Sequence, residues 1–405
     1  MIATLPFVPG MDLPCRWPVW LAALVLSSSF VAQATPFTPQ DDHQVLVRLP
    51  TSASDPRQRE RAERRRQLAR EPRRADLASA VVADLLAQLM ADGDPRFAGY
   101  AQAALAPWWD DPSPPADLRV ARAVLRQFSH DFDAALADLN GVVKDDPTHV
   151  QARAWIAAIS MVQARYELAR QACDQMAPHA SPLQAASCTA SVDAATGQAR
   201  RAVASFEGAL AAEPAASPDL RLWVLTRLAE TQERLGNPAA AEGAYRAALA
   251  LGQDDSYLLA AYADFLLDRQ RPSDVLVLLK DRERNDLHLL RLALAGKMLR
   301  HERAGGWQAA LAARFDAARQ RGDTAHQKEE ARFALAVLGD AARALPLARA
   351  NYAVQREVAD ARVLLEAALA TGQKSAAAPV LDWMRLSRIE SPVLQGLASQ
   401  VRALP

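Results

Sequence analysis

The chain has 405 residues, of which half are hydrophobic, and its 47 basic side chains balance 47 acidic ones. A chain of this length can bury a large core, and a net charge of zero excludes a whole-molecule attraction to nucleic acid or to an anionic surface. Aromatic residues are scarce, whereas alanine, leucine, arginine and glutamate recur in long stretches and lose little side-chain freedom in helices. We therefore predict an all-α protein.

Residues 1–34 have the features of a secretory signal peptide. Arg16 precedes an apolar run that ends in the small-residue sequence Ala32-Gln33-Ala34. We expect cleavage after Ala34 and a periplasmic or secreted protein, with either Met1 or Met11 as the start of translation. The alternative is an uncleaved anchor in the inner membrane, although the uninterrupted apolar run is shorter than the roughly 20 residues that a helical span needs.

Residues 35–74 are predicted to be a Pro/Arg-rich linker that is largely disordered. Ten arginines lie between positions 48 and 74, and the spacings of Glu60 with Arg64 and of Glu63 with Arg66 would form ion pairs on a solvated helix. Nucleic-acid binding is disfavoured, because the segment has almost no aromatic residue to stack on bases. A weak contact between the segment Arg57–Arg74 and an anionic surface stays open.

A spacing of five residues between a glycine and an alanine recurs in the rest of the chain. Gly197 precedes Ala202 by five positions, and the same step occurs at Gly236, Gly305, Gly339 and Gly372. The alanines of this series, completed by Val275, recur every 33 to 39 residues: Ala135, Ala169, Ala202, Ala241, Val275, Ala310, Ala344 and Ala377. A fixed period of this length predicts a repeat array.

A second small residue lies twelve positions before the alanine that defines each unit. Two antiparallel helices cross closely where both present small side chains, and glycine lets the turn between them adopt a positive φ. Pro147 and Pro214 stand where the second helix of a unit should end. The second alanines are Ala123, Ala157, Ala190, Ala229 and Ala263, and the larger residues expected between units are Leu139, Phe206, Tyr245 and Leu279.

These positions resemble the tetratricopeptide repeat (TPR), a 34-residue helix–turn–helix unit with small residues at its eighth and twentieth positions. The resemblance implies a right-handed helical-repeat solenoid of antiparallel helix pairs, a TPR-like superhelix of about eight or nine units over residues 75–405. Met298, Arg332 and Leu365 occupy the eighth position in later units, so looser helix contacts are expected there.

Cys173 and Cys188 are the two cysteines that follow the predicted signal peptide. They flank a turn between two units at equal distances, which places them at the same height on neighbouring antiparallel helices. In an exported chain this arrangement predicts a disulfide bond. The alternative is a pair of small buried thiols.

No catalytic or cofactor motif is present, and the seven histidines are scattered without metal-ligand spacing. We expect no catalytic residues, no metal and no cofactor. The resemblance implies a non-enzymatic scaffold of the bacterial cell envelope that binds a protein or peptide on its concave face. The alternatives are an envelope enzyme built on a solenoid and an accessory subunit of an export or assembly complex. The oligomeric state is left open.

The resemblance also implies which residues face the groove. In the family the second, fifth, ninth, twelfth and thirteenth positions of a unit point inward. In two central units these are Trp223, Thr226, Glu230, Glu233 and Arg234, then Tyr257, Ala260, Asp264, Leu267 and Asp268. Aromatics with four carboxylates predict a basic peptide ligand. The alternative is that Trp223 and Tyr257 are packing residues and that the carboxylates are merely solvated.

Overall fold

The computed structural model describes residue 41 and residues 55–405. Contacts divide the chain into two units, Met1–Ala53 and Ser54–Pro405, and everything below concerns the second unit. The predicted signal peptide and the uncleaved-anchor alternative both fall on residues 1–34, which lie outside the described residues, as does the linker up to residue 54 apart from Asp41. In the described part of the chain, no helix is long and apolar enough to cross a bilayer.

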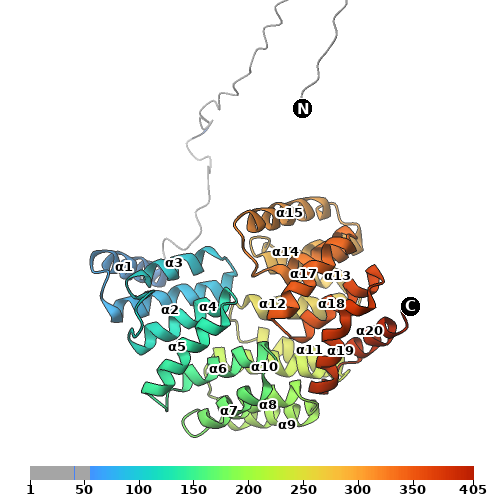
Figure 1. The fold of residues 1–405 in the computed structure, drawn as a ribbon. Coiled ribbons are helices and arrows are strands. Elements are labelled where there is room, and N and C mark those ends of the chain that lie inside the picture. Colours follow the sequence, from blue (N-terminus) through green and yellow to red (C-terminus); the bar gives the residue numbers. More distant parts are fainter. Residues whose placement is uncertain (1–40, 42–54) are drawn as a thin grey trace, which may run out of the picture. The chain divides into compact units, whose positions relative to one another are not determined.

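Residues 55–405 are folded into α-helices with no β-strand among them (Figure 1). Short 3₁₀ turns span Ala106–Trp108 and Lys374–Ala377, and a π-helical turn spans Phe333–Leu338. The α-helices are α1 (Pro56–Arg70), α2 (Ala75–Asp92), α3 (Arg96–Ala104), α4 (Ala116–Phe128), α5 (Phe132–Asp145), α6 (Val150–Val162), α7 (Tyr166–Met176), α8 (Pro182–Ala195), α9 (Ala199–Ala212), α10 (Pro218–Arg234), α11 (Pro238–Leu249), α12 (Ser256–Asp268), α13 (Pro272–Leu278), α14 (Asp286–Leu299), α15 (Ala304–Gln320), α16 (Gln327–Arg332), α17 (Ala341–Val354), α18 (Val358–Thr371), α19 (Ala378–Ser387) and α20 (Pro392–Arg402).

Consecutive helices pack as pairs, from α2 with α3 to α18 with α19, and α20 packs on the last pair. The predicted all-α helical-repeat solenoid is therefore confirmed. The alanines that define the repeat are buried at the crossing of each pair, as Ala190 with Ala202 and Ala229 with Ala241 illustrate. Small residues at these positions let the two backbones approach each other closely.

The turns between paired helices explain most of the recurring glycines. Gly197, Gly236, Gly339 and Gly372 all have positive φ, between 66° and 77°. A residue with a Cβ is strained in this left-handed region, so glycine is the residue that closes these turns at no steric cost.

Gly305 was predicted to occupy such a turn, and this prediction is wrong. Gly305 lies in the first turn of α15, and Arg300 instead takes the left-handed conformation that ends α14, with φ 51°. The small residue of α14 is Gly296, whose missing Cβ would lie 2.9 Å from the Trp307 ring. Met298, which the spacing placed at this contact, is exposed. The repeat has shifted here because a glycine–tryptophan contact replaces the usual pair of alanines.

Residues 56–70 differ from the predicted disordered linker, because they form the helix α1. Asp55 caps its first turn by accepting a hydrogen bond from the Arg57 N–H at 2.9 Å. Leu68 is buried against α2, and Arg64 forms an ion pair of 2.8 Å with Asp84 of that helix. The repeat pattern does not extend to α1, which is held by the buried Leu68 and by ion pairs of its arginines.

The two ion pairs expected for a helical form of this segment are present. Glu60 lies 3.6 Å from Arg64, and Glu63 lies 2.6 Å from Arg66. Both pairs are exposed at the surface, where such contacts stabilise a helix by only a few tenths of a kcal/mol.

A buried arginine fixes the insertion between α3 and α4. The Arg122 guanidinium donates hydrogen bonds to the carbonyl oxygens of Trp108, Trp109 and Asp111 at 2.6, 2.8 and 2.8 Å. Its remaining nitrogens donate to both carboxylate oxygens of Asp138 on α5, at 2.9 and 2.6 Å. One side chain therefore joins the insertion to both helices of the second pair, α4 and α5.

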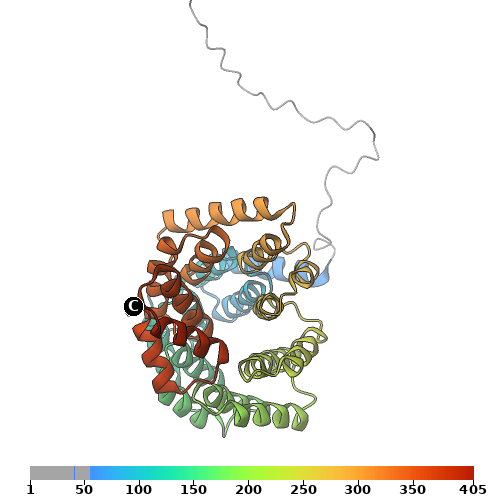
Figure 2. The ribbon, with the colours of Figure 1, turned by 90° about the vertical axis from the view of Figure 1, so that its right-hand side faces the viewer.

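The solenoid winds so tightly that segments far apart in the sequence touch at several places, and we describe two of them as junctions (Figure 2). We call the first place the first junction, where the end of α2 meets α12 and α14. Ser256 Oγ donates to the Met90 carbonyl at 2.7 Å, and Asn285 Nδ2 donates to the Asp92 carbonyl at 3.0 Å. Asn285 fills the space of the absent Cβ of Gly93, which would lie 2.7 Å from Asn285 Cγ.

The second junction joins the start of α9 to the segment between α19 and α20. The Ala199 N–H donates to Glu390 Oε2 at 2.6 Å. A Cβ at Gly197 would lie 2.9 Å from both the Cβ and the carbonyl oxygen of Arg388. Gly197 is thus required twice, once by its positive φ and once by the approach of a segment about 190 residues away in sequence.

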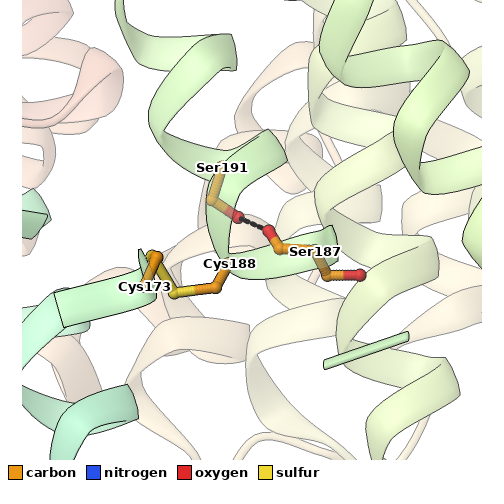
Figure 3. Close-up of a disulfide and its surroundings, with 4 residues drawn as sticks. All are labelled: Cys173, Ser187, Cys188 and Ser191. Atoms are coloured by element: carbon orange, nitrogen blue, oxygen red, sulfur yellow. Dashed lines mark hydrogen bonds between the residues drawn. A yellow bond between two sulfur atoms is a disulfide. The ribbon is translucent and has the colours of Figure 1, made fainter. Parts of the chain in front are cut away.

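The structure contains a disulfide bond between Cys173 on α7 and Cys188 on α8 (Figure 3). The two Cα atoms are 5.6 Å apart, which lies within the range that a disulfide spans without backbone movement. The bond crosses from one helix pair to the next, as the symmetric placement of the cysteines about the turn predicts. It therefore reinforces a contact between units rather than a contact within one unit.

Candidate functional site

The solenoid encloses a cavity of about 520 Å³ at its centre. The first helices of successive pairs (α8, α10, α12, α14, α16 and α18) contribute most of its wall, and the segment from Trp383 to Leu394 closes one side. Tyr257 is 45% exposed although it stands on this inner wall, so solvent reaches the cavity. The volume falls in the range of pockets that hold a small ligand or a short peptide segment.

The cavity brings together most of the residues that the resemblance assigned to the groove. Glu230, Glu233 and Arg234 line it from α10, and Tyr257, Ala260, Asp264 and Asp268 line it from α12. Their role in binding a partner remains a prediction.

Three of the groove residues do not line the cavity. Trp223 is 40% exposed but stands outside the cavity wall. Thr226 is buried and donates a hydrogen bond to the Leu222 carbonyl within its own helix, at 2.8 Å. Leu267 is buried in the hydrophobic core. Seven of the ten residues therefore line the cavity, and the three exceptions lie both early (Trp223, Thr226) and late (Leu267) in their units.

The sequence reading missed the part of the wall that later units supply. In the unit defined by Ala377, the second, fifth and ninth positions are Ala359, Arg362 and Glu366, and all three line the cavity. The same rule that selected Glu230 would have found them. The later units depart from the repeat pattern at the eighth position, which obscures their inward-facing residues in the sequence.

Asp264 is held by two arginines from later units. Arg291 Nε donates to Asp264 Oδ1 at 3.0 Å, and Arg332 Nη1 donates to the same oxygen at 2.7 Å. Burial alone would raise the pKa of Asp264, but the two guanidinium groups outweigh burial and hold that pKa well below its usual value. Asp264 is therefore ionised and neutralised within the chain.

Two further predicted carboxylates are also paired. Arg362 Nη2 donates to Asp268 Oδ1 at 2.9 Å. Glu230 lies 3.1 Å from Arg227 and accepts a hydrogen bond of 2.6 Å from the Tyr257 hydroxyl. Since the chain's own arginines neutralise these groups, the premise of the predicted basic ligand, a row of free carboxylates, is not met.

Glu233 is the exception among the four predicted carboxylates. It forms no ion pair within the described residues, and its one side-chain partner is the Tyr245 hydroxyl at 3.4 Å. Burial, together with the nearby charges of Asp268 and Glu230, raises the pKa of Glu233 to about 7. Near neutral pH this group therefore exchanges a proton inside the cavity.

The raised pKa of Glu233 predicts a pH-dependent stability. Between about pH 4.5, the model-compound value, and about pH 7 the native state binds more protons than the unfolded state. The free energy of unfolding therefore falls as the pH rises through that window. Glu233→Gln, which imitates the protonated form, should raise the free energy of unfolding at pH 8 by about 1–2 kcal/mol, since water in the cavity screens part of the shift. Urea unfolding at pH 8 and at pH 4.5 measures the difference.

At pH 4.5 the gain from Glu233→Gln should vanish, and an equal gain at both pH values would contradict this assignment. Glu366→Gln is the matched control in the same wall. It removes a carboxylate that Arg362 binds at 2.8 Å, so it should give no stabilisation at pH 8.

Among the described residues, the cavity wall carries eight basic and seven acidic side chains, and no group of three or more His, Cys, Asp or Glu residues there is arranged to hold a metal ion. Lys328 lies 3.5 Å from Glu329 and 3.7 Å from Asp360, and Arg227 stacks on the Tyr257 ring with its guanidinium carbon 4.7 Å from the ring centre. These contacts hold long side chains in fixed positions, as a preformed binding surface requires.

No protein-family model matches the chain, and no curated protein matches it. Among solved structures, the P58(IPK) TPR domain is similar over 80% of this chain and 98% of its own, with 14% identity and a TM-score of 0.22. The structure of Naa15/Naa10 bound to HypK-THB is similar over 87% of this chain and 65% of that chain, with 13% identity and a TM-score of 0.24. The fold is assigned from the helix pairs described above, not from these likenesses.

Proposed function

We propose that this chain is a non-enzymatic scaffold that binds a peptide segment of another protein in its central cavity. The observation that carries the proposal is the cavity itself, which the first helices of six consecutive pairs line with fixed charged and aromatic side chains. A helical solenoid offers its partner such an extended inner wall.

Most side chains of the wall support binding rather than chemistry, with Glu233 as the exception described above. Asp264, Asp268 and Glu230 are each engaged by arginines of the chain, so none of them is poised to take a proton from a substrate. Tyr257 presents a large ring that Arg227 holds in place, and an aromatic side chain fixed in this way provides contact area at low entropic cost.

We also propose that the protein acts in the bacterial cell envelope after export. The signal-like sequence ending at Ala34 supports export, and the disulfide between Cys173 and Cys188 suits an oxidising compartment. N-terminal sequencing of the protein from its native cell tests this step. A chain that begins after Ala34 supports it, and a chain that begins at Met1 or Met11 would contradict it.

Filling the cavity should abolish partner capture. Ala359 is exposed and lines the cavity from the first turn of α18, so Ala359→Trp places an indole ring in the binding space without disturbing the buried core. Pull-down from envelope extract with the full chain should lose a partner that the unmodified protein captures, by tenfold or more.

Ala353→Trp is the matched control, because Ala353 is an exposed alanine of α17 outside the cavity wall. It should retain the partner, and both variants should keep their helical content by circular dichroism. Capture that survives Ala359→Trp would show that the cavity is not the binding site.

A further inference from the structure

One corner of the cavity holds cationic side chains that the chain does not neutralise. Arg234 at the end of α10 and Arg356 just before α18 both line the cavity, and neither forms an ion pair with a carboxylate of the described residues. The other arginines and the lysine of the wall pair with acidic groups, except Arg269, which lies against the Phe265 ring. The unpaired charge is therefore concentrated in this corner.

Arg234 is fixed in place by neutral groups. Its Nη1 donates to the Ala194 carbonyl at 3.0 Å, its Nη2 donates to Thr231 Oγ1 at 3.2 Å, and its Nε donates to the Glu230 carbonyl at 3.3 Å. A guanidinium carries five N–H groups, so two remain for a ligand. Burial lowers the pKa of Arg234 by more than the nearby Glu230 carboxylate raises it, and the neighbouring Arg227 adds to the lowering.

The backbone of Arg356 is fixed to the end of α6. Its N–H donates to the Val162 carbonyl at 2.8 Å, at the end of α6, while its side chain is exposed and makes no hydrogen bond in the described structure. The two guanidinium groups both lie near enough to Tyr166 to act on its pKa. Arg356 is thus available to a ligand without giving up a contact.

Tyr166 supplies a third donor. Its hydroxyl oxygen accepts a hydrogen bond from Trp383 Nε1 at 2.8 Å, which leaves its own O–H to be donated into the cavity that both residues line. Two guanidinium groups and one hydroxyl, all of them donors, suit a group that only accepts hydrogen bonds and carries negative charge.

Glu357 does not supply the missing counter-ion. It follows Arg356 in the chain and lines the same cavity, but its carboxyl group forms no ion pair in the described structure. Burial and the neighbouring Asp360 raise the pKa of Glu357, which disfavours its charged form.

We propose that Arg234, Arg356 and Tyr166 form a binding site for a carboxylate group, so that the cavity selects a peptide segment with acidic side chains. This inference rests on the proposed peptide-binding function and names the chemistry of the bound segment. It replaces the basic ligand that the sequence suggested, because three of the four carboxylates on which that expectation rested are already paired within the chain.

The test is titration calorimetry of the full chain with two short peptides, acetyl-Ala-Glu-Ala-Glu-Ala-amide and its isosteric Gln counterpart. Both lack terminal charges, so a difference between them reports on the side-chain carboxylates alone. The Glu peptide should bind at least tenfold more tightly than the Gln peptide, and its affinity should fall with rising salt. Equal affinities, or no binding of either peptide, would overturn the proposal.

Arg356→Gln should weaken binding of the Glu peptide about tenfold and leave unfolding unchanged, since its side chain makes no contact that folding needs. Arg269→Gln is the matched control, an unpaired arginine elsewhere on the wall, and should change the affinity less than twofold. Inorganic phosphate at matched ionic strength is the second ligand. Phosphate binding without binding of the Glu peptide would overturn the assignment to an acidic peptide.

The two proposals fail separately. If Ala359→Trp abolishes partner capture while Arg356→Gln does not affect it, the scaffold function is supported and the selectivity for acidic segments is contradicted. If the Glu peptide binds through Arg356 but Ala359→Trp leaves partner capture intact, the carboxylate site stands and the cavity is not where the partner binds.

Discussion

Replacing Asp138 with alanine should lower the free energy of unfolding by about 3 kcal/mol, a typical cost of leaving one partner of a buried ion pair without the other. Asp138 and Arg122 are 6% and 4% exposed, so water cannot replace the lost carboxylate. The Arg122 charge would remain buried against the carbonyl oxygens of the insertion, which satisfy its N–H groups but do not neutralise it. Arg126, which also pairs with Asp138 at 2.8 Å, would lose its partner as well.

Urea unfolding followed by circular dichroism measures this change. Asp145→Ala is the matched control on the same helix, because Asp145 pairs with Arg119 at 3.1 Å but its side chain is 66% exposed. Its loss should cost less than the loss of Asp138, because the exposed carboxylate is already solvated and Arg119 keeps its hydrogen bond of 2.7 Å to the Ser113 hydroxyl. A cost for Asp138→Ala as small as that of the control would show that the buried pair does not fix the insertion.

Gly197→Val should destabilise the protein by about 3 kcal/mol and loosen the second junction. A β-branched residue is strained at the positive φ of this turn, and its Cβ would also collide with the backbone of Arg388. Relief of the collision requires the segment between α19 and α20 to move away, with loss of the hydrogen bond from Ala199 to Glu390. Amide hydrogen exchange in α19 and α20 should become faster.

Gly236→Val distinguishes the backbone strain at positive φ from the collision with Arg388. Gly236 has the same φ of 77°, but a Cβ there would meet no atom within 4 Å. This variant should carry the backbone strain alone, cost less than Gly197→Val, and leave hydrogen exchange in α19 and α20 unchanged. Equal costs for the two variants would mean that the approach of Arg388 is not a tight contact.

The repeat architecture could be predicted because its causes are local and recur. Each helix pair needs a small residue at its crossing and a residue of positive φ at its turn, so Ala202 with Gly197 and Ala241 with Gly236 form a visible period. The disulfide followed from the same register, since Cys173 and Cys188 lie symmetrically about one turn. Where other residues form the contact between two helices, as Gly296 and Trp307 do between α14 and α15, the period predicts the turn at the wrong residue.

The charge pattern of the cavity could not be predicted, because the partners are distant in sequence. Asp264 meets Arg332 across 68 positions, and Asp268 meets Arg362 across 94. A list of inward-facing positions identifies these carboxylates but not the arginines that neutralise them. The junctions between turns were missed for the same reason, since no period connects Ser256 with Met90 or Ala199 with Glu390.

The two junctions change how this solenoid should respond to stress. In an open array each repeat contacts only its neighbours, so the end units fray first and stability is close to a sum of neighbouring terms. Here the end of α2 is bound to α12 and α14, and the segment before α20 is bound to the start of α9. Neither end can open without also breaking contacts in the middle of the chain. Heat or denaturant should therefore melt the array in a single cooperative step, and the terminal helices should resist proteolysis as long as the central ones do.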